Sequence, residues 1–154
     1  MKILVATDGS TFGNRALEKA CDFSAGAKDV AYKVVSVYEP PIPTAAEPYA
    51  MSLEYYQHLD EVAKRQAENA VQKAVDAIRD KFPDPSVEIT MIVRLGNPAQ
   101  IIVEEAENWA SDLVVVGSHG YGFWGRLAVG SVSDAVVHHA PCSILVVKSQ
   151  AEKG

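Results

Sequence analysis

The sequence predicts an α/β protein in which an open parallel β-sheet is covered by helices on both faces. Short apolar runs that do not alternate with polar residues recur along the chain, which is typical of strands buried on both faces of a parallel sheet. Segments with helical spacing of apolar residues separate these runs, so right-handed crossovers place helices on both faces. The 154 residues, 48% of them hydrophobic, are enough for one domain with a buried core.

Five strands are predicted. Four of them are runs of Val, Ile and Leu, at residues 3–6, 34–37, 113–116 and 144–147. The fifth, at residues 87–94, mixes apolar and polar residues and is expected nearer to a sheet edge. A stretch at residues 39–50 contains four of the eight prolines and is predicted to be a long irregular loop.

Four helices fill the gaps between the strands. The first is expected over residues 13–25, with an apolar face of Ala16, Leu17, Ala20, Cys21 and Phe23–Ser24. The second runs from Leu59 and stops at Phe82–Pro83, because proline restricts the residue before it. The third begins at Asn97, with Pro98 in its first position and an inward face of Ala99, Ile102, Val103, Ala106, Trp109 and Ala110. The fourth covers residues 130–139 and ends before Pro141.

Composition narrows the function. A net charge of −6 and a pI near 5.1 argue against nucleic acid or an anionic membrane surface as the main partner. No apolar run approaches the ~18 residues of a membrane span, and the N-terminal run stops at Ala6, too short for a signal peptide. We therefore predict a cytoplasmic protein with Cys21 and Cys142 reduced, one domain over residues 1–148 and a frayed tail at 149–154.

The segment between residues 117 and 133 carries the strongest chemical signal. Half of the ten glycines lie between residues 117 and 130, and glycine lets backbone N–H groups approach a ligand closely. Gly130 and Ser131 open the last helix, whose free N–H groups and positive dipole end attract phosphate, and Ser131 and Ser133 add hydroxyl donors. The residues alone leave a second interpretation open, in which Gly130 is a turn glycine, Ser131 a helix cap and the loop merely flexible.

Several other motifs are rejected. Gly120-x-Gly122-x-x-Gly125 matches a dinucleotide-binding pattern, but it follows the fourth strand, and Leu145 stands where the acidic residue is required. The chain has no P-loop, no nucleophile elbow and no Cys/His spacing suited to a structural metal.

The spacing Gly117-x2-Gly120-x9-Gly130-Ser131 resembles the G-x2-G-x9-G-[ST] motif of ATP-binding universal stress proteins. The resemblance extends to the opening Ile3-Leu4-Val5-Ala6-Thr7-Asp8-Gly9-Ser10 and to the closing Ala140-Pro141-Cys142-Ser143-Ile144-Leu145-Val146-Val147. It implies a Rossmann-like, five-stranded sheet of order 3-2-1-4-5, of the adenine nucleotide alpha hydrolase type.

The resemblance also implies a nucleotide site. Adenine would lie near Thr7, Asp8 and Val37, and ribose near Val116 and Gly117. The phosphates would lie beside His119, Gly120, Gly130, Ser131, Val132 and Ser133. Asp8 would approach the ribose or a phosphate-bound Mg²⁺, and the alternative for this residue is a turn acid that caps the next helix.

The remaining candidates are predicted to have ordinary roles. Arg126 is expected to be an exposed loop residue, and His138 and His139 to be structural residues of a last helical turn. Trp109 is expected in the core, whereas Trp124 could shield a ligand or a partner surface. Neither cysteine has a C-x-x-C partner, which argues against redox chemistry.

Three functions follow in order of preference. The first is a regulatory protein that binds ATP with Mg²⁺ and hydrolyses it slowly at most, because no P-loop lysine or water-activating residue is identified. The second is a nucleotide-using enzyme with a substrate pocket at residues 39–53, and the third an interaction module without nucleotide. A homodimer is predicted through the apolar edge strand from Ser143 to Val147, since an open apolar edge invites pairing.

Overall fold

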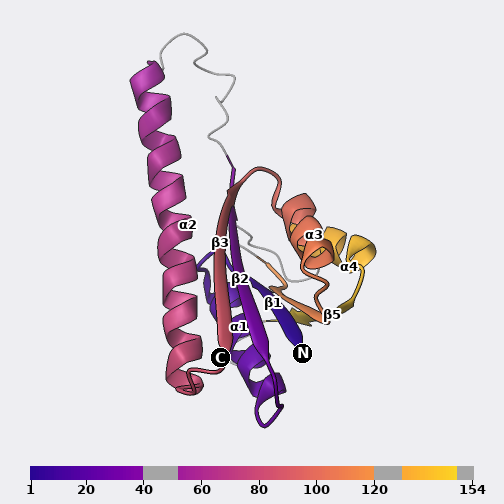
Figure 1. Cartoon of the computed structure of the whole chain (residues 1–154). Coiled ribbons are helices and arrows are strands. Elements are labelled where there is room, and N and C mark those ends of the chain that lie inside the picture. The colour runs from indigo at the N-terminus through magenta and orange to yellow at the C-terminus, as the bar shows by residue number, and fades with distance from the viewer. Residues whose placement is uncertain (40–51, 120–129, 149–154) are drawn as a thin grey trace, which may run out of the picture.

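The computed structural model describes residues 1–39, 52–119 and 130–148, which form one five-stranded parallel sheet between two helical layers (Figure 1). The strands are β1 (Lys2–Ala6), β2 (Ala31–Tyr38), β3 (Glu88–Leu95), β4 (Leu113–Gly117) and β5 (Ser143–Val147). Their order is β3-β2-β1-β4-β5, with every neighbouring pair parallel, so the predicted fold and strand order are confirmed. The mixed strand β3 lies at one edge, as expected, and β5 lies at the other.

The helices are α1 (Thr11–Ser24), α2 (Leu53–Lys81), α3 (Pro98–Asn108) and α4 (Ser131–His139). Helix α2 begins at Leu53 with Ser52 as its N-cap, earlier than the predicted start at Leu59. Its buried residues all lie between Ala67 and Ile78, and its first half projects beyond the sheet (Figure 1). The apolar periodicity from Leu59 therefore covers the buried part of α2 but misses its first turns, residues 53–58.

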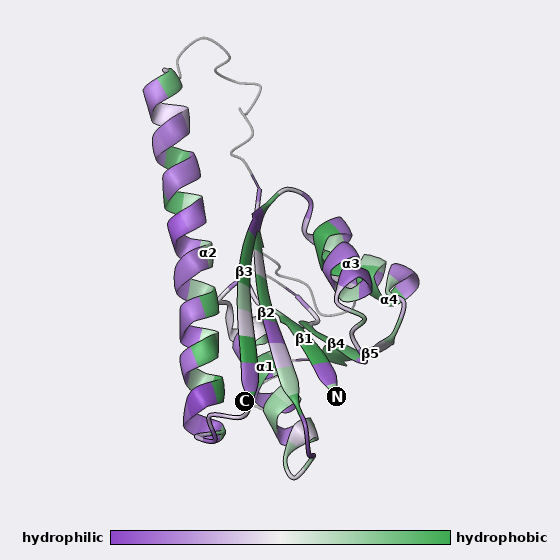
Figure 2. Cartoon of the chain, viewed as in Figure 1, coloured by the Kyte–Doolittle hydropathy of each residue, from purple (hydrophilic) through white to green (hydrophobic). Residues whose placement is uncertain are grey.

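The sheet separates two hydrophobic clusters, as the green strands between helices of mixed colour indicate (Figure 2). One cluster joins alternate strand residues such as Ile3 and Val5 to α1 and α2. The other joins Leu4 and Val35 to α3 and α4. Alternate residues of β1 thus face opposite clusters, which explains why its apolar residues run without polar interruption.

Two predicted inward faces need correction. Phe23 in α1 is 61% exposed, since it follows Cys21 by two residues and points to the other side of the helix. In α3 the buried residues are Ile101, Ile102, Glu105 and Ala106, whereas Ala110 lies beyond the helix end and is exposed. Trp109 is half-buried and packs against the second cluster.

Helix α3 ends in a tight turn that places Ala110 in the left-handed region, at φ 51°. The N–H of Ser111 donates to the carbonyl of Ala106, and that of Ala110 donates to the carbonyl of Glu107. These two bonds form a Schellman motif, in which the left-handed position favours glycine.

Ala110→Gly is therefore expected to stabilise the protein. Relief of the left-handed strain, about 1–2 kcal/mol, exceeds the added chain entropy of glycine, which leaves a net gain of about 0.5–1 kcal/mol in the free energy of unfolding. Urea denaturation measures the change. Ala63→Gly, within α2, is the control and is expected to lose about 0.5–1 kcal/mol. Equal losses in both variants would contradict the prediction.

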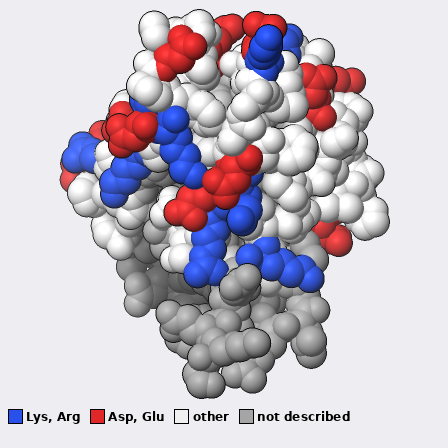
Figure 3. Space-filling model, turned by 90° about the horizontal axis from the view of Figure 1, so that it is seen from below, with Lys and Arg blue, Asp and Glu red and all other residues white. Residues whose placement is uncertain are grey.

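No helix in the described part of the chain is both long and apolar enough to cross a membrane. On the face shown in Figure 3, basic and acidic side chains are intermixed, with wide uncharged areas beside them.

Candidate functional site

A cavity of about 330 Å³ opens at the carboxyl ends of β1, β2 and β4. The strand order reverses between β1 and β4, which is where open α/β sheets bind ligands. The sequence-predicted site residues that the structure describes all line this cavity: Thr7, Asp8, Val37, Val116, Gly117, His119, Gly130, Ser131, Val132 and Ser133. The remaining one, Gly120, lies outside the described residues, as do Trp124, Arg126 and most of the predicted 39–50 loop.

The turn after β1 is fixed by side-chain to backbone hydrogen bonds. Asp8 Oδ1 accepts from the N–H of Ser10 at 2.9 Å, and Thr7 Oγ1 accepts from the N–H of Gly9 at 3.1 Å. Ser10, rather than Asp8, is the N-cap of α1, because its Oγ accepts from the N–H of Gly13 at 3.2 Å. The alternative role of Asp8 as a helix cap is therefore wrong, although Asp8 does stabilise the turn.

Gly13 is a lining residue that the sequence analysis missed. A Cβ at this position would lie 2.7 Å from Thr7 Oγ1 and 3.1 Å from Asp8 Oδ1. The absent side chain lets the first turn of α1 pack directly against Thr7 and Asp8. The available sequence signal was the glycine itself, in the first turn of a predicted helix. Helix propensity does not favour glycine there, so its presence indicates a close contact.

The N-terminus of α4 forms the opposite side of the cavity. Gly130 is the N-cap and provides no side-chain hydrogen bond, so Ser131 is the first helical residue and not the cap. The N–H of Gly130 donates to the carbonyl of Ser118 at 2.7 Å, which ties the start of α4 to the end of β4. The first turn of α4 lines the cavity, and within the described ranges no side chain accepts a hydrogen bond from its N–H groups.

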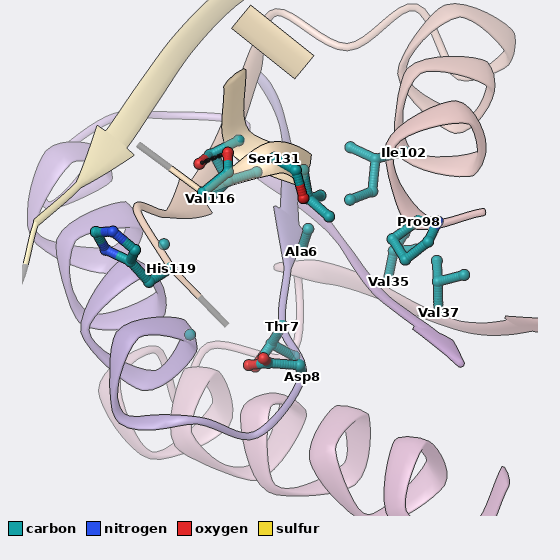
Figure 4. Close-up of a pocket in the computed structure, with 15 residues that line it drawn as sticks. Ala6, Thr7, Asp8, Val35, Val37, Pro98, Ile102, Val116, His119 and Ser131 are labelled. Atoms are coloured by element: carbon teal, nitrogen blue, oxygen red, sulfur yellow. Dashed lines mark hydrogen bonds between the residues drawn. The ribbon is translucent and has the colours of Figure 1, made fainter. Parts of the chain in front are cut away.

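The two serines of this turn differ. Ser133 is buried, and its hydroxyl donates to the carbonyls of Ser118 and Gly130, at 3.1 and 2.9 Å. Its proton is thus engaged within the protein in this structure, and the role of Ser133 as a hydroxyl donor to a ligand stays a prediction. Ser131 is exposed and lines the cavity (Figure 4).

His119 follows β4 and lies away from the apolar part of the cavity (Figure 4). Its Nδ1 is 3.0 Å from Ser118 Oγ, and its ring is tilted by 54° against the ring of Phe12, with 5.3 Å between centroids. These contacts fix the orientation of the imidazole at the edge of the cavity.

The apolar wall comes from two elements that are far apart in the sequence. Val35 and Val37 of β2 face Pro98 and Ile102 of α3 (Figure 4). Sequence reasoning identified Pro98 only as a helix start and Ile102 only as an inward residue. No sequence signal paired them with β2, because α3 crosses that strand only in the folded chain.

Other chemical groups are unremarkable. In the described ranges, no three or more His, Cys, Asp or Glu residues gather closely enough to hold a metal ion. Burial raises the pKa of the Cys21 thiol and of the Cys142 thiol, which disfavours the reactive thiolate in both. Burial also raises the pKa of Tyr32 to about 12. His138, at the end of α4, lies 3.8 Å from Asp134.

A Rossmann-like parallel α/β protein with a cavity at the switch point of its strands is the class that this fold and site define. The chain matches the universal stress protein family over residues 1–148, and it belongs to that family.

Relatives match nearly the whole chain. Universal stress protein A homolog 2 of Coxiella burnetii is 34% identical, covering 96% of this chain and 94% of its own length. A universal stress protein of Synechocystis is 30% identical, covering 96% of this chain and 97% of its own length.

Solved structures share the fold. The hypothetical protein MJ0577 has a TM-score of 0.81 at 24% identity, with 98% of this chain and 97% of that chain covered. A universal stress protein in complex with cAMP scores 0.67 at 24% identity, with 97% and 98% covered. An Arabidopsis thaliana member of the family with AMP bound scores 0.67 at 20% identity, with 99% and 94% covered.

Proposed function

We propose that this protein is a regulatory nucleotide-binding protein that takes up ATP, with Mg²⁺, in the strand-end cavity. One observation carries the proposal: a single cavity combines an apolar wall with the N-terminus of a helix whose N-cap, Gly130, has no side chain. An adenine ring needs an apolar wall, and a phosphate chain needs the N–H groups of a helix N-terminus.

The adenine fits between β2 and α3. Val35, Val37, Pro98 and Ile102 offer apolar surface to the faces of a flat base. Val37 is the last lining residue of β2, so its backbone is in reach of the polar edge of the base. The ribose then lies toward Val116 and Gly117 at the end of β4.

The phosphates fit at the other end of the cavity. The N–H groups of the first turn of α4 and the hydroxyl of Ser131 are hydrogen-bond donors, and the helix dipole adds positive potential there. These donors favour a polyphosphate over AMP or a cyclic nucleotide. His119 also lines the cavity, and the resemblance to the family predicts that Gly120 contacts the phosphates as well.

The described lining residues fit Mg²⁺ only if phosphate oxygens of the nucleotide supply further ligands. Asp8 is the one acidic side chain among the described lining residues, and one of its oxygens already accepts from Ser10. A single carboxylate together with phosphate oxygens is a set that Mg²⁺ accepts. Bound Mg²⁺ would offset the negative charge that ATP adds to a chain of net charge −6.

Hydrolysis is expected to be slow. The described lining contains no lysine or arginine that could stabilise charge on a transferred phosphoryl group. The nucleotide therefore acts as a ligand that changes the state of the protein. Family members with bound cAMP and AMP support an adenine nucleotide as the ligand class.

The test has two measurements. Calorimetric titration of the nucleotide-free protein with ATP is expected to give saturable binding that weakens when EDTA removes Mg²⁺. Mass spectrometry of the small molecules released on denaturation of freshly purified protein is expected to detect an adenine nucleotide. A titration without heat up to millimolar ATP would overturn the proposal.

We also propose that the protein is a homodimer through β5. This strand is at the sheet edge, and Ile144, Leu145 and Val146 are only half-buried in the single chain. Pairing with β5 of a second copy covers the open backbone groups and the apolar side chains.

Light scattering at micromolar protein is expected to give twice the 16.6 kDa mass of one chain. The single-chain mass at that concentration would contradict the dimer.

A further inference from the structure

Beneath the apolar wall of the cavity, α3 and β2 are also joined by buried charges. Lys33, Val35 and Val37 alternate along β2 and therefore share one face. Pro98, Ile102 and Glu105 follow each other along α3 at spacings of one helical turn. The cavity is lined by Val35 and Val37 at the carboxyl end of β2 and by Pro98 and Ile102 at the start of α3. Lys33 and Glu105, at the other end of the two series, form an ion pair.

Glu105 is the centre of this ion cluster. Its Oε2 lies 3.1 Å from Lys33 Nζ, and its Oε1 lies 3.0 Å from Arg94 Nη1. The side chains of Lys33 and Glu105 are 10% and 9% exposed, whereas that of Arg94 is half exposed. The carboxylate therefore links α3 to two strands at once, because Arg94 belongs to β3 and pairs with Val37 in the sheet.

Trp109 holds the C-terminal end of α3, beyond Glu105, against the sheet. Lys33 Nζ lies 5.1 Å from the centroid of the Trp109 ring, within the range of a cation–π contact. Lys2 Nζ lies 5.7 Å from this centroid and donates to the Trp109 carbonyl at 3.1 Å. The C-terminal end of α3 is thus fixed to both β1 and β2.

The buried ion pair of Lys33 and Glu105 fixes the position of α3 on β2 more than it stabilises the folded protein. Desolvation offsets much of the attraction in a buried ion pair, and apolar replacements of similar size are often as stable. Contacts between two apolar side chains are not directional. Hydrogen bonds at both carboxylate oxygens, in contrast, allow only one position of α3 along and across the strands.

We infer that Glu105 is a positioning residue for the nucleotide base. By fixing α3 against β2 it sets the distance between Pro98 and Ile102 on one side and Val35 and Val37 on the other. This inference rests on the proposed function, since it assigns the specificity of the apolar wall to a residue that does not line the cavity.

The main test variant is Glu105→Gln, which keeps the size of the side chain and removes its charge. Titration with Mg·ATP is expected to show at least about 10-fold weaker binding, because α3 no longer has one fixed position. Binding of inorganic tripolyphosphate, which contacts only the α4 end, is expected to change by less than about 2-fold. Glu107→Gln, exposed on the same helix, is the control and should bind ATP like the wild type.

A second variant separates positioning from stability. Lys33→Met/Glu105→Leu removes the buried charges together and is expected to unfold in urea near the wild-type midpoint. It should nevertheless bind ATP as weakly as Glu105→Gln. This variant also keeps the test decisive if the single variant does not fold.

The outcomes distinguish the two proposals. If the wild type does not bind ATP, both are overturned. If the wild type binds ATP and the folded double variant binds it equally well, only the positioning role is overturned. Equal weakening for ATP and tripolyphosphate in Glu105→Gln would overturn it as well, because the loss would not be confined to the base.

Discussion

Replacing Gly130 with valine is expected to weaken ATP binding by at least about 100-fold, equivalent to about 2.7 kcal/mol. Gly130 has φ −62° and ψ 154°, which any residue can adopt, so contact rather than backbone strain decides the effect. A Cβ there would lie 3.0 Å from the Ser118 carbonyl oxygen and 3.4 Å from His119 Cα. The branched side chain of valine must push the end of β4 away from α4.

The displacement removes more than one interaction. The 2.7 Å bond from the Gly130 N–H to the Ser118 carbonyl and the bond from Ser133 Oγ to the same oxygen both depend on this approach. The donors at the start of α4 then lose their place relative to the apolar wall. Calorimetric titration with Mg·ATP measures the loss.

Gly26→Ala is the control for a general loss of stability. Gly26 has φ +83°, so alanine is strained there, but a Cβ would meet no atom within 4 Å. This variant should be less stable by about 0.5–1 kcal/mol, the left-handed strain less the gain in chain entropy, and bind ATP normally. Unchanged ATP affinity in Gly130→Val would instead show that the glycine serves only the turn. Light scattering should give the same mass for Gly130→Val as for the wild type, since β5 is not altered.

Gly117→Ala is expected to cause the largest loss of folding stability from a single added methyl group, about 2–3 kcal/mol. The new Cβ would lie 2.9 Å from both the carbonyl carbon and the Cβ of Phe12, and 3.0 Å from its carbonyl oxygen. Two of these three atoms are backbone in the first turn of α1, so no side-chain rotation relieves the contact. Either α1 or the end of β4 must shift.

Urea denaturation without ligand measures this effect, and Gly26→Ala again provides the comparison. Gly117→Ala should lose more stability than Gly26→Ala. Gly117 is not in the left-handed region, so this loss would come from the contact with Phe12 and not from backbone strain. If Gly117→Ala unfolded with the wild-type free energy, the start of α1 would have to be free to move, contrary to its packing.

The limits of the sequence prediction are clearest in β2 and α2. The predicted strand at 34–37 missed Tyr32 and Lys33, which are buried within β2. A lysine breaks an apolar run in sequence, and only its partner Glu105 on α3 makes its burial acceptable. The start of α2 was missed because residues 53–58 precede the apolar periodicity that begins at Leu59, and none of them is buried.

In the site, the sequence identified residues that follow a strand or begin a helix. Gly117 and Gly130 belong to such junctions and to a spaced glycine motif, whereas Thr7 and Asp8 were assigned to the site through the resemblance to the family. Pro98 and Ile102 were not identified as lining residues, because they join the cavity by packing across β2.

The sequence by itself determined the class of fold, the strand order through its family resemblance, and the place of the cavity at the ends of β1 and β4. The fold class and the place of the cavity depend on local patterns, such as uninterrupted apolar runs and spaced glycines, whereas the strand order rests on the resemblance. Only the tertiary structure decided the apolar wall and the buried cluster around Glu105. Both are made by residues that are distant along the chain, and no local pattern encodes which face of α3 meets β2.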